Sequence, residues 1–201
     1  MSKTRFEQMQ DQLCTHLSPE QGPRVRQAMA REYEALSAQY AQQPKDMENH
    51  TQNNIFPVVT AYHALLAEGM AKDDAVQLAN DSFLELMEPI AETIRKALKF
   101  PGLYQLMPWL WNTLMPKLFS PDAGFRFTFY PSDRHQVKFD MEACPYYQVC
   151  QELGCPELGP TFCATDDTCY GHMHPKLIWN RTQTIARGAD CCDFDLYIPQ
   201  K

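Results

Sequence analysis

The stretch FRFTFYPSDRHQVKFDMEACPYYQVCQELG, residues 125–154, decides the fold class of this chain. Apolar and polar residues alternate over 125–130 and again over 135–141, and Pro131-Ser132-Asp133 between the two runs favours a turn. The pattern predicts a β-hairpin whose apolar face is formed by Phe125, Phe127 and Phe129. Residues 144–154 then predict a helix that ends at Gly154, so the periodicity changes from strand to helix within one short segment.

Two more strands are expected further along the sequence. The segments LIWNRTQTIA, residues 177–186, and CCDFDLYI, residues 191–198, have strand-like composition and are joined by a turn at 187–190. Residues 156–171, between the two strand pairs, predict a second short helix or a structured loop. The order strand-strand-helix-strand-strand predicts an α+β fold with a four-stranded antiparallel sheet covered by helices.

The first part of the chain has helical periodicity. Helices are expected over residues 3–17, from about residue 23 to residue 40, over 57–69 and over 73–99. The polar segment 42–54, which contains Pro44, is expected to be a loop. We therefore predict one domain over residues 1–201, in which a helical half (1–120) packs on a cysteine-rich α+β half (121–201) that carries the site.

The most apolar segment is FPGLYQLMPWLWNTLMPKLF, residues 100–119. Pro108 and Pro116 argue against one smooth helix, so short helices packed on the core are expected. The alternative is a pocket lid or a dimer surface that presents Trp109 and Trp111, which would make a homo-oligomer possible.

Composition and charge restrict the class of partner. The 201 residues suffice to bury a core, and 44% hydrophobic with 21% charged residues is typical of a globular protein. The net charge of -7 argues against a nucleic-acid partner and leaves a small molecule as the expected one. The first residues contain no apolar signal segment and the chain has no apolar run of about 18 residues, so a cytoplasmic protein without a membrane span is predicted.

Seven of the eight cysteines lie between residues 144 and 192. In the cytoplasm such cysteines act as thiols, metal ligands or catalytic groups more often than as disulfides. Neither a CxxC pair nor a ferredoxin-type spacing is present, so no cofactor is predicted. A metal or iron–sulfur cluster held by Cys144, Cys163 and Cys192 remains open, and His172 and His174 could join it.

Two cysteines are candidates for nucleophilic catalysis. Cys144 follows a predicted strand and opens a predicted helix, where a thiolate is stabilised. Cys163 lies three residues before Asp166, which would place the thiol and the carboxylate on one face of a helical turn. The alternative is that both cysteines are small buried core residues.

Other single residues carry weaker signals. Arg181 could bind a substrate carboxylate, His63 is expected to be a packing residue, and His50 is expected to be solvated. The chain has no GxGxxG, P-loop or GxSxG motif, so no nucleotide cofactor is indicated.

Over about residues 55–197 the sequence resembles the L-2-amino-thiazoline-4-carboxylic acid hydrolase family. The matching pieces are Pro57 through Tyr62 to Leu65-Leu66 and Gly69, Ala75, Cys144-Pro145-Tyr146, Glu152-Leu153-Gly154, Glu157-Leu158, Phe162-Cys163 with Asp166, Thr184 to Gly188, and Cys192-Asp193-Phe194. Cys150, Cys155, Cys169 and Cys191 are not part of this pattern.

The resemblance implies a hydrolase that opens a thiazoline-type cyclic amidine ring by C–N cleavage. The catalytic candidates are then Cys144, Cys163, Asp166 and Cys192, and the candidate substrate contacts are Arg181, Tyr62, Trp109 and Trp111. The alternative hypothesis is a cysteine-based protein that binds a metal, an iron–sulfur cluster or a haem-like ligand and has a redox role. A third possibility is an interaction protein whose cysteines are only core residues.

Overall fold

A computed structural model of the chain describes residues 3–200. The N-terminal helices are α1 (Arg5–Cys14), α2 (Gln21–Gln39), α3 (Lys45–His50), α4 (Phe56–Ala67), α5 (Lys72–Leu98) and α6 (Met107–Leu118). The remaining elements are β1 (Arg126–Phe129), β2 (Gln136–Ala143), α7 (Pro145–Glu152), α8 (Gly159–Tyr170), β3 (Ile178–Asn180) and β4 (Cys192–Tyr197). The predicted α+β class, with a helical part followed by a four-stranded antiparallel sheet, is confirmed.

The sheet has the strand order β1-β2-β4-β3, and every neighbouring pair is antiparallel. One face is apolar because inward positions alternate along β2 and β4, and register pairs Val137 with Leu196 and Phe139 with Phe194. The same register pairs Met141 with Cys192 near the end of β2. Cys192 and Cys144, which directly follows β2, therefore lie at the same end of the apolar face of the sheet.

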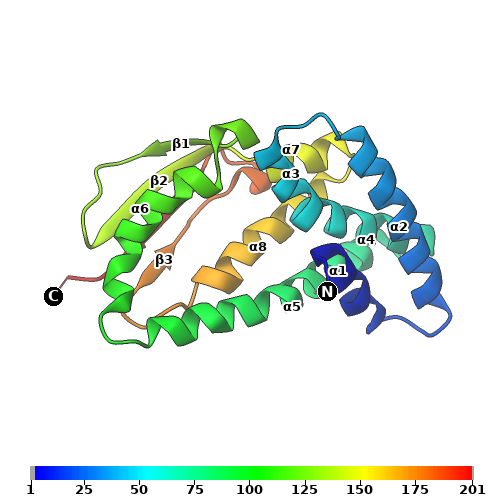
Figure 1. Ribbon diagram of the computed structural model, residues 1–201, viewed down its shortest axis with the longest axis horizontal. Coiled ribbons are helices and arrows are strands. Elements are labelled where there is room, and N and C mark those ends of the chain that lie inside the picture. The colour runs from blue at the N-terminus through cyan, green and yellow to red at the C-terminus, as the bar shows by residue number, and fades with distance from the viewer. Residues whose placement is uncertain (1–2, 201) are drawn as a thin grey trace.

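Helices cover the apolar face of the sheet, and further helices lie beyond them on the side away from the sheet. In Figure 1, α8 lies between the sheet and the group formed by α1 to α4, and α5 runs along the edge of both parts. Two clusters of buried side chains result, one among the first helices with α7 and α8 and one between α6 and the sheet. Half-buried Phe119, Phe127, Met141 and Tyr170 pack against both clusters, so the two cores meet at these residues.

The loop predicted for residues 42–54 is wrong. The segment forms α3 and a π-helical turn, Thr51–Ile55, that continues into α4. Its polar side chains support a helix instead of breaking it, since Asn53 donates to Asn49 (2.8 Å) and Gln52 donates to Glu48 (3.0 Å). Only a narrow face is apolar, which is why the composition resembles that of a loop.

The strand predicted for residues 177–186 is shorter than expected and ends at Asn180. The backbone N–H groups of Thr182 and Gln183 donate to the Asp193 carboxylate at 2.9 and 2.7 Å instead of to a neighbouring strand. A carboxylate that captures two consecutive amides ends the ladder. The chain therefore turns away from the sheet directly after Arg181.

Gly159, the first residue of α8, provides a test of this packing. A Cβ at this position would lie 2.5 Å from Tyr147 Cδ2 and 3.1 Å from Ala186 Cβ. Gly159→Ala is expected to lower the free energy of unfolding by about 1–3 kcal/mol, because an overpacked site forces neighbours to shift. Chemical denaturation measures this change.

Gly22→Ala is the matched control. Its Cβ would meet Cys14 Sγ at 3.7 Å, an ordinary contact, and α2 gains a better helix former. This variant is expected to be neutral or more stable by up to about 1 kcal/mol. Equal losses in the two variants would contradict the close approach of α8 to Tyr147.

Candidate active site

A cavity of about 260 Å³ lies where the two cores meet. Its walls come from α5, α6, α7, α8, the ends of β2 and β4, and the π-helical turn. Most of the lining is aromatic or methionine, including Phe83, Met87, Trp111, Phe139, Tyr170 and Trp179. A small number of polar groups face this apolar space, which is the usual composition of a small-molecule site.

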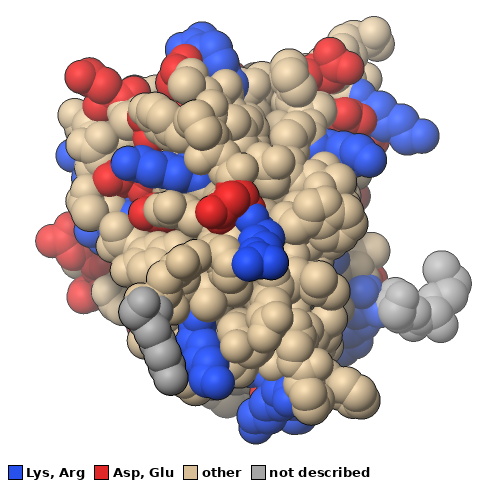
Figure 2. All heavy atoms as spheres, turned by 90° about the vertical axis from the view of Figure 1, so that its left-hand side faces the viewer, with Lys and Arg blue, Asp and Glu red and all other residues tan. Residues whose placement is uncertain are grey.

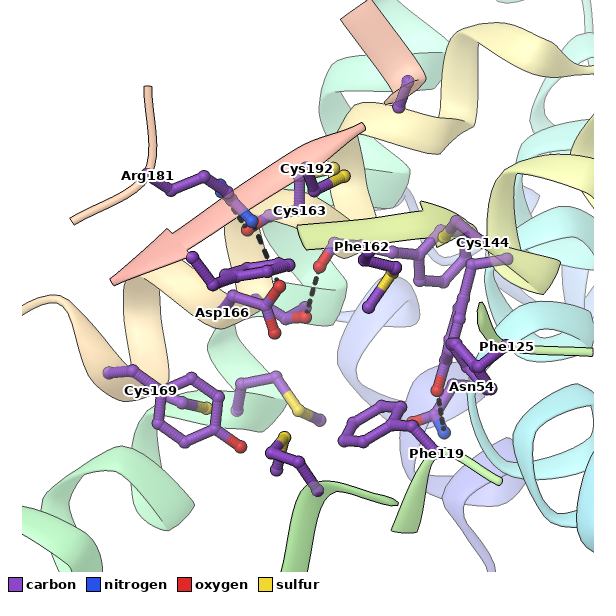
Figure 3. Close-up of a pocket in the computed structure, with 18 of the residues that line it drawn as sticks. Asn54, Phe119, Phe125, Cys144, Phe162, Cys163, Asp166, Cys169, Arg181 and Cys192 are labelled. Atoms are coloured by element: carbon purple, nitrogen blue, oxygen red, sulfur yellow. Dashed lines mark hydrogen bonds and ion pairs between the residues drawn. The ribbon is translucent and has the colours of Figure 1, made fainter. Parts of the chain in front are cut away.

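The cavity brings together the four predicted catalytic residues. Cys144, Cys163, Asp166 and Cys192 all line it, as does Arg181. In Figure 3, Cys163 and Cys192 lie next to each other beside Arg181, Asp166 lies below them, and Cys144 lies further along the cavity at the end of its strand. Residues distant in sequence thus converge on one site, although their roles stay predictions.

Asp166 is an ionisable group of the cavity whose environment strongly shifts its pKa. Its side chain lines the cavity and retains 31% of its accessible surface, although many protein atoms surround the carboxylate. Burial raises the pKa of Asp166 to about 7, and the positive charge of Arg181 opposes this shift without cancelling it. A carboxyl group with this pKa can both accept and release a proton at neutral pH.

The thiols around Asp166 have raised pKa values, whereas reactive cysteines have lowered ones. Burial raises the pKa of Cys144 to about 12 and that of Cys192 to about 11, and it also raises the pKa of Cys163. The first amides of α7 oppose this shift at Cys144, as expected for a helix N-terminus, but burial outweighs them. At neutral pH these thiols are therefore protonated.

Arg181 is held in place by three acceptors. Its guanidinium donates to Asp166 Oδ2 (3.1 Å), to Asp167 Oδ2 (2.8 Å) and to the carbonyl of Cys163 (3.0 Å). Its side chain is only 6% exposed and lies over the Phe194 ring. These contacts fix Arg181 against α8, so its N–H groups are largely occupied.

The predicted substrate contacts divide into two groups. Trp111 is buried in the cavity wall, where it packs against Tyr170 and Trp179. Trp109, on the other side of α6, is exposed and does not line the cavity. Tyr62 does not line it either, because its hydroxyl donates to Glu157 elsewhere in the fold.

A network of hydrogen bonds that connects Asn54, Tyr146 and His50 below the cavity was not predicted from the sequence. The Asn54 amide donates to the Tyr146 hydroxyl (3.2 Å), which donates to His50 Nδ1 (2.9 Å), and His50 Nε2 donates to the carbonyl of Leu118 (3.1 Å). The carbonyl can only accept, which assigns the proton to Nε2. His50 is therefore buried, and its predicted solvation is wrong; burial lowers its pKa, which keeps the ring neutral.

One further charged residue was missed. Arg5, at the start of α1, lines the cavity, and within residues 3–200 it makes no ion pair or hydrogen bond with a side chain. Desolvation lowers its pKa. No sequence motif marks this arginine, because it lies far from the cysteine-rich segment.

The other cysteines have separate environments. Cys169 also lines the cavity, whereas Cys150 and Cys155 are buried together next to His63. His63 Nδ1 lies 2.6 Å from Glu32 Oε1, so this histidine has a polar partner, as a packing residue with satisfied hydrogen bonds does. Across residues 3–200, no group of three or more His, Cys, Asp or Glu side chains is arranged to hold a metal ion.

The fold and the cavity define a class of α+β protein with a mostly aromatic site around one perturbed carboxyl group. A model of the L-2-amino-thiazoline-4-carboxylic acid hydrolase family matches residues 48–196, and the chain belongs to this family. The resemblance inferred from the sequence is thereby confirmed. No curated protein and no solved structure matches the chain.

The hydrogen-bonded chain below the cavity can be tested with Tyr146→Phe. Loss of the hydroxyl leaves His50 Nδ1 and the Asn54 amide without this partner, so the free energy of unfolding is expected to fall by about 1–3 kcal/mol. Tyr147→Phe is the control, because the Tyr147 hydroxyl makes no hydrogen bond within the described chain, and a change below about 0.5 kcal/mol is expected. The account of this network would be wrong if both variants unfolded at the same denaturant concentration.

Proposed function

We propose that this protein is a hydrolase that opens a cyclic amidine ring of the thiazoline type inside the cavity. Asp166 is the proton-transfer group, and the observation that carries this proposal is its pKa of about 7 in a mostly apolar cavity. Membership of the thiazoline carboxylic acid hydrolase family supports the reaction class. The small volume of the cavity supports a small-molecule substrate.

The proposed reaction begins with a water molecule beside Asp166. The ionised carboxylate takes one proton as the water oxygen forms a bond with the amidine carbon of the ring. As this bond forms, the π-electron pair of the C=N bond moves to the ring nitrogen, and the protonated Asp166 gives its proton to that nitrogen. Asp166 then takes the remaining hydroxyl proton as the carbon–oxygen double bond forms and the carbon–nitrogen bond breaks, and it passes this second proton to the departing nitrogen. The carboxylate is regenerated, and the product is the ring-opened molecule with one water added.

Water is favoured over a cysteine as the nucleophile. A thiol attack requires a thiolate, and burial holds the pKa of Cys144 and Cys192 near 12 and 11. Asp166 has a pKa of about 7, well below both values, so it is ionised when the thiols are not. In this proposal Cys144, Cys163 and Cys192 shape the wall next to the reacting carbon and exclude bulk water.

The two arginines have different roles in the proposal. Arg181 positions Asp166 and keeps its pKa from rising further, since its guanidinium already contacts two carboxylates. Arg5 faces the cavity without such a partner in the described chain, which suits it to bind the carboxylate of a substrate. Trp111 provides an apolar wall for the ring.

Asp166→Asn is the direct test of the proposal. The variant keeps the shape of the side chain and removes proton transfer, so the rate of ring opening of 2-amino-thiazoline-4-carboxylate should fall by about 10²–10⁴-fold. In the wild type, the rate should rise with pH through a midpoint near 7, as Asp166 loses its proton. The variant should lack this rise. Both are measured by following substrate loss across a pH series.

Asp167→Asn is the control, because Asp167 pairs with the same arginine but is 57% exposed and does not line the cavity. It should retain most of the activity. A rate in the wild type that keeps increasing toward pH 11 would show that a thiolate is the nucleophile. Full activity in Asp166→Asn would overturn the proposed role of Asp166.

A further inference from the structure

The corner between α5 and α6 exposes a group of large apolar side chains to solvent. Phe100 is 74% exposed, Trp109 is 59% exposed, and Leu103 and Leu106 lie exposed between them around a shallow surface hollow. These four residues, called here the apolar corner, have no role in the core. Scattered apolar residues are common on surfaces, but a contiguous group marks an interaction site.

The helix α6 has two apolar faces with different surroundings. Trp111 and Met115 point inward and line the cavity, whereas Trp109 points away from it. Packing of α6 on the sheet therefore explains the inward face only. The outward face is left uncovered by the described chain.

The apolar corner is bordered by positive charge. No Asp or Glu occurs from residue 93 to residue 121, although the chain as a whole has a net charge of -7. Lys99 is adjacent to Phe100 and forms no ion pair within residues 3–200, and Lys176 lies 5.9 Å from the ring of Tyr104, in the turn that contains Leu103 and Leu106. Figure 2 looks onto this end of the molecule, where uncharged surface in the lower part is bordered by lysine and arginine while acidic residues gather above.

We propose that the apolar corner docks this protein on the surface of an anionic lipid bilayer. Phe100, Leu103, Leu106 and Trp109 would enter the interfacial region, where aromatic and leucine side chains are favoured. Lys99 and Lys176 would contact the anionic headgroups. No helix within the described chain is long and apolar enough to cross a membrane, so the contact is with the bilayer surface.

The charge pattern favours a bilayer over a second copy of the chain. In a two-fold symmetric dimer through the apolar corner, the basic border of one copy would lie close to the basic border of the other. This like-charge contact opposes association, whereas an anionic lipid surface complements both the apolar centre and the basic border. The docking proposal rests on this surface alone and does not depend on the proposed chemistry in the cavity.

Vesicle co-sedimentation of the full-length protein tests the proposal. The protein should bind vesicles of phosphatidylcholine mixed with phosphatidylglycerol, and bind much less to vesicles of phosphatidylcholine alone. High salt should weaken the binding, because headgroup attraction is screened. No binding to the anionic vesicles, or equal binding to both kinds, would overturn the proposal.

Two double variants separate the contribution of the apolar side chains to vesicle binding from that of the lysines. Phe100→Ser with Leu106→Ser removes apolar anchors, and Lys99→Glu with Lys176→Glu reverses the basic border. Each lysine lost should weaken partitioning by about fivefold, and reversal should weaken it further. Circular dichroism melting checks that both proteins are folded, as expected for substitutions of exposed residues.

Arg31→Glu with Lys45→Glu is the matched control, since it makes the same charge change at exposed positions in α2 and α3, away from the apolar corner. This control should bind like the wild type; an equal loss would show that only net charge matters and would overturn the specific surface. Light scattering of the wild type in solution provides the other decisive outcome. A dimer that Phe100→Ser with Leu106→Ser dissociates would replace the bilayer with a second copy.

Discussion

The burial of the Asp166 carboxylate against Arg181 is the interaction on which the site depends. An isolated carboxylate in an aromatic cavity would be neutral at all moderate pH values, whereas one with an unshielded arginine would be fully ionised. The two effects balance here at a pKa of about 7. The raised pKa also affects stability. The unfolded chain loses the Asp166 proton near pH 4, whereas the folded state keeps it up to about pH 7. Between these two values the folded state binds more protons, so the contribution of Asp166 to stability falls as the pH rises.

The fold supports this interaction from several directions. Asp166 and Cys163 share one face of α8, and the short β3 releases Arg181 at the point where it can reach both. The end of β4 contributes Cys192 from the apolar face of the sheet. Residues of α5 and α6 line the other side of the cavity that the carboxylate faces.

The sequence predicted much of this arrangement where a local pattern was sufficient. The alternating residues of the hairpin and the three-residue spacing of Cys163 and Asp166 are local signals. The hairpin was predicted correctly, and the helix that carries Cys163 and Asp166 was one of the two alternatives predicted for its segment. His50, Asn54 and Arg5 were missed or misplaced, because their importance depends on packing against segments far away in the chain. The pKa shifts of the thiols could not be predicted either, since burial outweighs the helix N-terminus only in the folded cavity.

The most direct test of the central claim is a titration of the aspartate side chains by carbon NMR with labelled carboxyl groups. One aspartate signal should titrate near pH 7 in the wild type, and this signal should be missing in Asp166→Asn while the other signals are retained. Aspartate signals that all titrate below about pH 5 would contradict the account, because Asp166 would then be an ordinary ion-pair partner of Arg181 with no proton to exchange at neutral pH.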